Sequence, residues 1–187
     1  MGRASEHRLA CLLVVAAVGC VQSPAGPQNP AAVTTRSPPA AAAAPSPSVF
    51  ERPWIWSDEG GTPVALSRWR GNLLVVTLFF TSCTTTCPVT VDKLLRLGDT
   101  FRREGRAATF VLVTLDPSND KPAELRRFKT ARGLPPDWHL LRGNDQETRE
   151  LADFLGIRIM NEDSHIVHDG RIVFLDPQGR LLGQYRG

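Results

Sequence analysis

The sequence predicts an α/β fold in which a central mixed β-sheet is flanked by helices and followed by a C-terminal β-hairpin. Three observations support this prediction. From residue 50 onward, short apolar runs alternate with amphipathic stretches. The run LLVVTLFF at residues 73–80 is almost unbroken, as in a central strand that is covered on both faces. Residues 176–179, Asp-Pro-Gln-Gly, form a turn signal between two strand-like runs.

The first half of this region gives two buried strands and the helix between them. A short strand is expected at residues 62–66, after a pair of glycines, and the first buried strand at 73–80. The loop TSCTTTCPVT follows directly. Pro88 suits the first turn of a helix, and apolar residues then recur at helical spacing. The second buried strand is expected at residues 109–115 (TFVLVTL).

The second half completes the sheet and its helical cover. We expect, in order, a helix capped by Asp120, a short strand at 138–141, a helix from Asp145, a polar loop at 161–170, and hairpin strands at 171–175 and 180–185. Strand, cysteine loop, helix, strand, helix and hairpin, in this order, are typical of a thioredoxin-like fold. The sequence therefore predicts a thioredoxin-like domain over residues 50–187.

The N-terminal part has the features of an export signal and a tether. Residues 1–20 combine two arginines with an apolar stretch of eleven residues, 9–19, which is too short to cross a bilayer core of about 30 Å. The stretch ends at Ala-Val-Gly-Cys20, which resembles the lipobox of bacterial lipoproteins; ordinary signal cleavage near Gly19 and an uncleaved anchor are the alternatives. Residues 21–49 are rich in Pro and Ala and are expected to form a disordered tether. We expect an exported, lipid-anchored protein on the periplasmic side of a bacterial membrane.

Length and charge narrow the classes of function. With 187 residues, the chain is long enough for one globular domain with a core. Its formal net charge is only +3, and the basic residues form no stripe along the sequence. A nucleic-acid surface needs such a concentration of positive charge. We therefore expect no nucleic-acid partner.

Cys83 and Cys87 are the residues of this region with the clearest chemistry. The helix that begins beside them offers backbone N–H groups and a dipole that favour thiolate, so a low thiol pKa is predicted. Thiolates are nucleophiles in disulfide exchange and also ligands for soft metals such as Cu(I). Three residues separate the two cysteines, which widens the loop relative to the two-residue spacing of thioredoxin-type oxidoreductases. A metal site, a redox pair and a structural disulfide all remain open at this point.

A metal site with two thiolates needs a third ligand, and histidine is the usual one. His139, His165 and His168 are the candidates in this domain. His139 follows Trp138 in a short predicted strand and is expected to be a surface residue. His165 and His168 both lie in the predicted polar loop. The residues alone do not choose between these two.

Three stretches carry a resemblance to the Sco/SenC family of copper chaperones. They are residues 70–88, with a strand and the motif C-x-x-x-C-P; residues 113–120, VTLDPSND; and residues 168–179, HDGRIVFLDPQG. The distance from the histidine to the turn proline, nine residues, selects His168 over His165. The resemblance implies copper ligands at Cys83, Cys87 and His168. Thr84 and Val167 stand where the family commonly has proline and aspartate, so His165 stays an alternative to His168 as the third ligand.

The resemblance also implies what the protein does. Family members are thioredoxin-like copper chaperones that help to assemble the copper centre of cytochrome c oxidase. The expected cargo is one copper ion, Cu(I) or Cu(II), and the expected partner is the copper-bearing oxidase subunit or another copper-carrying protein. The alternative is an enzyme, a thiol-disulfide oxidoreductase that reduces the copper-ligand cysteines of the oxidase through Cys83 and Cys87.

Overall fold

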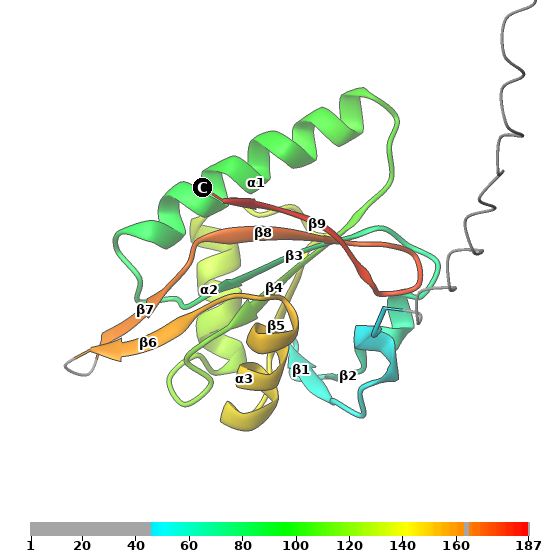
Figure 1. Ribbon diagram of the computed structural model, residues 1–187. Helices are drawn as coiled ribbons and strands as arrows, with labels where there is room; N and C mark the ends of the chain where they lie inside the picture. Colours follow the sequence, from blue (N-terminus) through cyan, green and yellow to red (C-terminus); the bar gives the residue numbers. More distant parts are fainter. Residues whose placement is uncertain (1–45, 163–164, 187) are drawn as a thin grey trace, which may run out of the picture. The chain divides into compact units, whose positions relative to one another are not determined.

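The computed structural model describes residues 46–162 and 165–186, without the side chains of 161–165 (Figure 1). The predicted signal peptide at 1–20, with Cys20, falls outside the described residues, as does nearly all of the predicted tether at 21–49.

The described chain begins to pack just ahead of the predicted domain boundary. Ser48 Oγ donates a hydrogen bond to the carbonyl of Gln178 at 2.5 Å, and the N–H of Val49 donates to the carbonyl of Gly179 at 2.9 Å. These contacts fasten a short 3-10 helix, η1 (Val49–Glu51), to the turn near the C-terminus.

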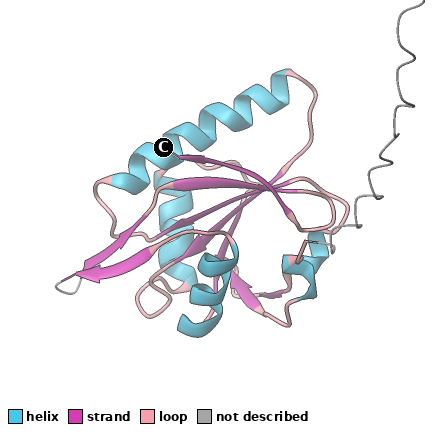
Figure 2. Ribbon diagram, viewed as in Figure 1, coloured by secondary structure: helices cyan, strands magenta, loops and turns pink. Residues whose placement is uncertain are grey.

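A seven-stranded mixed sheet forms the centre of the domain (Figures 1 and 2). Its strand order is β2-β1-β5-β4-β3-β8-β9. The strands β5, β4 and β3 are parallel, whereas β8, β9, β1 and β2 are paired antiparallel to their neighbours. The predicted mixed sheet is therefore confirmed. The bounds are β1 (Trp56–Asp58), β2 (Pro63–Val64), β3 (Leu74–Phe79), β4 (Thr109–Thr114), β5 (His139–Arg142), β8 (Arg171–Leu175) and β9 (Leu181–Arg186).

Helices cover both faces of this sheet, because alternate side chains of each strand point to opposite faces. One buried cluster joins Val75 and Leu112 of the sheet to α1 (Thr86–Arg103) and α2 (Pro122–Ala131). The other joins Val76 and Val111 to α3 (Asp145–Phe154) and to the short 3-10 helices η1 and η2 (Leu66–Trp69). All six residues of β3 are buried, which agrees with the unbroken apolar run seen in the sequence.

The C-terminal hairpin of β8 and β9 is confirmed. Asp176 Oδ1 accepts hydrogen bonds from the N–H groups of Gln178, at 2.9 Å, and Arg180, at 2.8 Å. Gly179 has a φ of 78°, a conformation that a residue with a side chain rarely adopts. The Asp-Pro-Gln-Gly signal thus acts through both its first and its last residue.

Two predictions are wrong, one about a strand and one about a helix cap. The strand expected at 62–66 is only the two-residue β2, because the chain turns at Ala65 into the 3-10 helix η2. Asp120 does not cap α2. The cap position belongs to Lys121, and the Asp120 carboxylate instead accepts hydrogen bonds from Thr81 and Thr114. Since Pro122 is the first residue of α2, Asp120 lies one residue too early in the chain to be the cap.

The polar loop expected at 161–170 is also wrong. A separate two-stranded sheet stands there, formed by β6 (Ile159–Glu162) and β7 (His165–His168), with Ile159 opposite His168 (Figure 1). Polar residues on these strands hid the strand pattern, since a two-stranded ribbon has little apolar surface to bury. This hairpin carries His168 to the cysteine loop.

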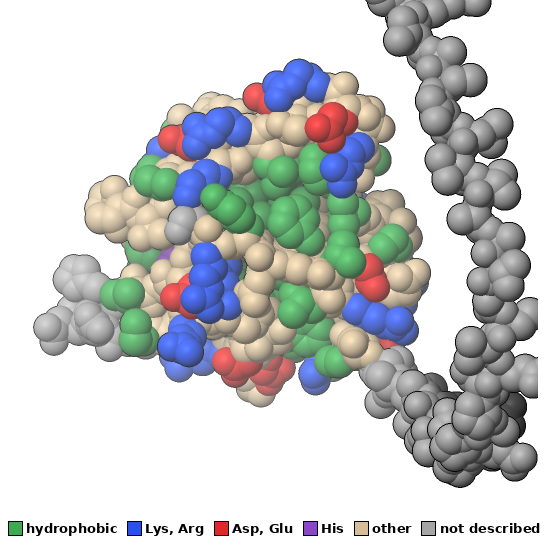
Figure 3. All heavy atoms as spheres, turned by 45° about the horizontal axis from the view of Figure 1, so that its top comes forward, with side chains coloured by type: hydrophobic (Ala, Val, Ile, Leu, Met, Phe, Trp, Pro, Cys, Tyr) green, Lys and Arg blue, Asp and Glu red, His purple; other side chains and the backbone are tan. Residues whose placement is uncertain are grey.

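The surface over α1 and β9 bears an apolar patch with basic residues nearby (Figure 3). It includes a groove of about 380 Å³ lined by Lys93, Arg96, Leu97, Thr100, Ile172, Phe174 and Tyr185. Among the described helices, none combines the length and the apolar character needed to cross a membrane.

Candidate metal centre

The cysteine loop joins the end of β3 to the start of α1. The N–H of Cys83 donates to the carbonyl of Phe80 at 3.2 Å, which closes a turn directly after the strand. Cys87 is the second residue of α1, as Pro88 predicted. Cys83 is 8% exposed and Cys87 is 1% exposed, and both sulfurs are free thiols. Cys83 packs within the cluster on the α1 side of the sheet.

The two thiols differ in acidity because their surroundings differ. The N–H of Cys87 donates to Cys83 Sγ at 3.3 Å. Burial raises the pKa of Cys83, but hydrogen bonds from the side chain and backbone of Cys87 and from the backbone of Thr85 and Thr86 outweigh burial, so the pKa of Cys83 is lowered. Burial, and then the hydrogen bond to Cys83, raise the pKa of Cys87 to about 12. The predicted low pKa is thus correct for Cys83 and wrong for Cys87.

His168 lies beside the buried thiol. Its Nε2 is 3.7 Å from Cys87 Sγ, although 81 residues separate the two in sequence. Its Nδ1 is 3.1 Å from the carbonyl of Asp169, which can only accept, so Nδ1 carries the proton and the Nε2 lone pair points toward the sulfur. Burial lowers the pKa of His168, against a smaller opposing effect of Asp169. The imidazole is therefore neutral at pH 7 and available as a ligand.

The turn after His168 is packed closely against α1. A methyl group added at Gly170 would lie 2.7 Å from Thr86 Cγ2 and 3.0 Å from Thr90 Oγ1, so only glycine allows this approach. Arg171 then fastens the turn. Its buried guanidinium donates to Asp169 Oδ2 and to Gln184 Oε1, each at 2.7 Å. These contacts fix where the His168 backbone lies relative to the cysteine helix.

A pocket of about 510 Å³ opens between the cysteine loop and β7. Hydroxyl side chains form one wall, while Ile166, Val167 and His168 form the other. Cys83 lies on its surface, whereas Cys87 does not, so an ion that enters meets Cys83 and His168 first. The lining residues are Phe80, Ser82, Cys83, Thr84, Thr85, Thr86, Asp116, Ile166, Val167 and His168.

The other histidine candidates stand apart from this arrangement or outside the description. His139 is half-buried, with its ring 4.8 Å from that of Trp69, and burial lowers its pKa. The surface position expected for it is therefore wrong. His165 is placed by its backbone in β7, opposite Glu162, but its side chain is among those not described. Of the described histidines, His168 is the one beside a cysteine.

Cys83, Cys87 and His168 are neighbours, but their donor atoms do not yet enclose one point. In the described part of the chain, no group of three His, Cys, Asp or Glu side chains is arranged as a complete ligand set. The side chains must therefore move before the three donors can surround one ion. The chemistry of the donors, two sulfurs and a neutral imidazole nitrogen, suits copper.

Several residues that build the site were missed by the sequence reasoning. Gly170 and Arg171 set the place of His168, and Asp116 lines the pocket. A glycine between the ligand histidine and a strand is a signal for close backbone approach. No local pattern indicates that Arg171 is buried, because its partner Gln184 lies on the neighbouring strand.

Comparison with known proteins identifies the family of this chain. Residues 42–187 match the SCO1/SenC family. A SCO1 protein homolog of Bacillus subtilis (strain 168) is 27% identical over 140 residues, which cover 72% of this chain and 72% of that protein.

Solved structures of Sco proteins share the thioredoxin-like fold. A SCO1/SenC family lipoprotein from Bacillus anthracis str. Ames has a TM-score of 0.67 at 22% identity, over 71% of this chain and 82% of that one. ScoI from Arabidopsis thaliana with copper bound has a TM-score of 0.64 at 19% identity, over 73% and 87% of the two chains. Since the family match spans most of the sequence, this protein belongs to the SCO1/SenC family.

Proposed function

We propose that the protein is a copper chaperone that binds one copper ion through Cys83, Cys87 and His168 and passes it to another protein. The observation that carries this proposal is that His168 Nε2 lies 3.7 Å from Cys87 Sγ, next to Cys83. A redox pair alone does not need a neutral imidazole at that place. Membership in a family with copper-bound structures supports the same cargo.

Copper binding should depend on the redox state of the cysteines. Thiolates are ligands for copper, whereas the sulfurs of a disulfide are poor ones. Titration of the reduced protein with Cu(I), and separately with Cu(II), should give one tightly bound ion per chain. The oxidised protein should bind at least about 100-fold more weakly, since it loses two of three ligands. Equal affinity in both states would refute the proposal.

A second candidate function is favoured by the unequal acidity of the thiols. In a thiol-disulfide oxidoreductase, the Cys83 thiolate would attack a disulfide of the partner and displace one partner thiolate. Cys87 would then lose its proton and attack the Cys83 sulfur, releasing the partner's second thiolate. The partner gains two electrons, and a Cys83–Cys87 disulfide forms. The cysteines of an oxidase copper site are the expected substrate.

His168→Ala separates the two functions. The variant should lose copper affinity by at least about tenfold because it lacks the third ligand. Its rate of disulfide exchange should stay within about twofold, because Cys83 and Cys87 remain. Thr130→Ala, on α2, serves as the matched control for both measurements. A variant that keeps full copper affinity and loses exchange would instead favour the enzyme.

We infer that the acceptor is the copper-bearing subunit of cytochrome c oxidase and that the protein works on the periplasmic side of a bacterial membrane, anchored by a lipid on Cys20. The apolar stretch ending at Cys20 and the family membership support this. Mass spectrometry of the cellular protein should find a lipid-modified N-terminal Cys20. The copper-loaded protein should transfer its ion to the soluble apo domain of that subunit, observed through the absorption of the acceptor.

A further inference from the structure

Asp120 is a buried carboxylate whose hydrogen bonds lead to the cysteine loop. It is 1% exposed. Its Oδ2 accepts from the N–H of Thr81 at 3.0 Å and from the hydroxyl of Thr114, and its Oδ1 accepts from the hydroxyl of Thr81. One side chain just before α2 thus binds the turn that follows β3 and the last residue of β4.

Neither an ion pair nor a helix cap explains why the Asp120 carboxylate is buried. No lysine or arginine in the described part of the chain pairs with Asp120. The cap position of α2 belongs to Lys121. Burying a charged group is costly unless hydrogen bonds compensate, and here three donors provide that compensation. Two of the three come from Thr81.

Thr81 occupies the turn that delivers Cys83. That turn is closed by the hydrogen bond from the N–H of Cys83 to the carbonyl of Phe80, and Thr81 is its second residue. Because Asp120 binds both the backbone and the side chain of Thr81, the turn has little freedom to rotate. The position of Cys83 relative to Cys87 and His168 depends on that turn.

We propose that Asp120 is a positioning residue of the copper site, which acts by holding Thr81 and so fixes the place of Cys83. The inference rests on the proposed function, because it concerns the same ligands. It adds a residue from the loop between β4 and α2, outside the cysteine loop and the histidine strand. Groups behind the ligands of a metal site commonly change metal affinity by about 10- to 100-fold.

Three variants of the full protein test this proposal. Asp120→Asn removes one acceptor oxygen and places an N–H₂ group against a donor, so Cu(I) affinity should fall by at least about tenfold. Thr81→Val removes only the hydroxyl donor and should cause a smaller loss of about three- to tenfold. Thr114→Val is the matched control. It breaks a hydrogen bond to the same carboxylate, and the one from the N–H of Asp116 to Thr114 Oγ1 at 3.0 Å, but leaves Thr81 held, so copper affinity should stay within about twofold.

Two measurements distinguish positioning from general stability. Each variant is titrated with Cu(I) against a coloured chelator. A separate sample of each is loaded with Cu(II), and its thiolate-to-Cu(II) absorption band is recorded. Asp120→Asn and Thr81→Val should alter that band, and Thr114→Val should not. In the double variant Asp120→Asn/Thr81→Val, affinity should equal that of Asp120→Asn alone, since both act through one contact.

The outcomes separate this inference from the proposed function. Should Asp120→Asn bind copper within about twofold of the wild type, the inference is overturned and copper binding stands. Equal losses in Thr114→Val and Thr81→Val would also overturn it, since stability alone then explains the effect. Where Asp120→Asn does not fold, the comparison of Thr81→Val with Thr114→Val decides. Failure of the wild-type protein to bind copper would instead refute the proposed function.

Discussion

At the scale of single residues, Cys83 and Cys87 differ in the acidity and in the burial of their thiols. The lowered pKa of Cys83 gives a thiolate on the pocket surface, ready for an incoming ion or disulfide. Cys87 is buried deeper, with a pKa of about 12, and keeps its proton at neutral pH. Copper binding through both sulfurs must therefore displace a proton from Cys87.

This displacement predicts how copper affinity depends on pH. His168 has its pKa lowered from the ordinary value of 6.5, so above pH 7 it is neutral and releases no proton. Cys87 releases one proton at every pH well below about 12. Raising the pH favours the state with fewer protons, so affinity should rise by about tenfold per pH unit, or about 100-fold from pH 7 to 9.

Competition titrations at several pH values measure this slope. Any Cys83 thiol that is still protonated adds to it at the lower end of the range. Cys87→Ser is the control: it should bind more weakly, and its slope should fall below one proton per ion because the serine hydroxyl does not ionise there. A wild-type affinity that is constant from pH 7 to 9 would show that Cys87 is not a thiolate ligand.

At the scale of elements, the sequence predicted best where one segment carries its own signal. The unbroken apolar run of β3, the helical spacing of α1 and the turn before β9 are local patterns, and all three elements are present. The β6–β7 hairpin was missed because its polar residues look like a loop. The cap predicted at Asp120 is wrong because its partners are distant in the chain or in another element: Thr81 lies in the turn after β3 and Thr114 ends β4.

The residues of the candidate site could be predicted from the sequence, whereas their geometry could not. The cysteine spacing and the resemblance selected Cys83, Cys87 and His168, which the structure brings into one neighbourhood. Burial of Cys83 and the rise in the pKa of Cys87 depend on packing from both sides of the loop. Such burial comes from tertiary contacts, which a pattern along one segment does not contain.

The contact between the β7–β8 turn and α1 predicts the effect of Gly170→Ala. The added methyl group would meet Thr86 Cγ2 and Thr90 Oγ1, and threonine side chains in a helix have few alternative rotamers. The turn must move away from α1 and take His168 with it. Copper affinity should fall by at least about tenfold, while alkylation of Cys83 should proceed within about twofold of the wild-type rate.

Gly183→Ala is the matched control for that substitution. Gly183 lies in β9, and a methyl group added there meets no other atom within 4 Å. Its copper affinity should equal that of the wild type. Gly170→Ala with unchanged affinity would mean that the distance between His168 and the cysteine helix does not govern binding.

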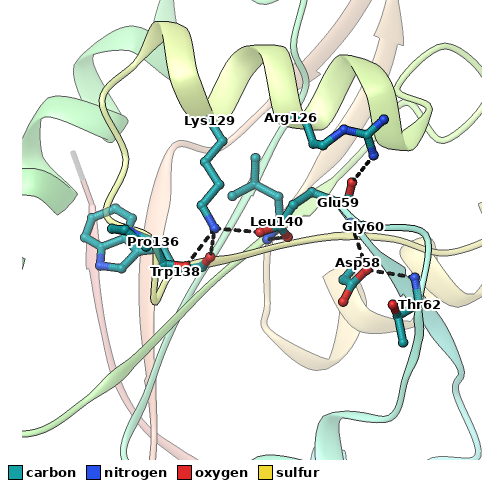
Figure 4. A network of polar contacts seen from close by, with 9 residues as sticks. All are labelled: Asp58, Glu59, Gly60, Thr62, Arg126, Lys129, Pro136, Trp138 and Leu140. Carbon is teal, nitrogen blue, oxygen red and sulfur yellow. Dashed lines mark hydrogen bonds and ion pairs between the residues drawn. The ribbon is translucent and has the colours of Figure 1, made fainter.

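At the scale of the whole molecule, both faces of the sheet are covered, and contacts far from the proposed copper site hold its other parts together. The β1–β2 turn is fastened to α2 and β5 by a polar network around Glu59 and Lys129 (Figure 4). Lys129 Nζ donates to Glu59 Oε1 at 2.5 Å and to the carbonyls of Pro136, at 3.0 Å, and Trp138, at 2.5 Å. Glu59 Oε2 accepts from the N–H of Leu140 at 3.0 Å. None of these residues lines the pocket beside Cys83 and His168.

That separation predicts a change in stability without a change in copper binding. The side chains of Lys129 and Glu59 are only 15% and 18% exposed, so Lys129→Met leaves a largely buried carboxylate and two carbonyls without their cation. The free energy of unfolding should fall by about 2 to 3 kcal/mol, which urea denaturation of the apo protein measures. Arg127→Met, in an exposed pair on the same helix, should cost no more than about 0.5 kcal/mol. Copper affinity at 25 °C should be unchanged in both variants, and a loss confined to Lys129→Met would show that the network supports the site as well as the fold.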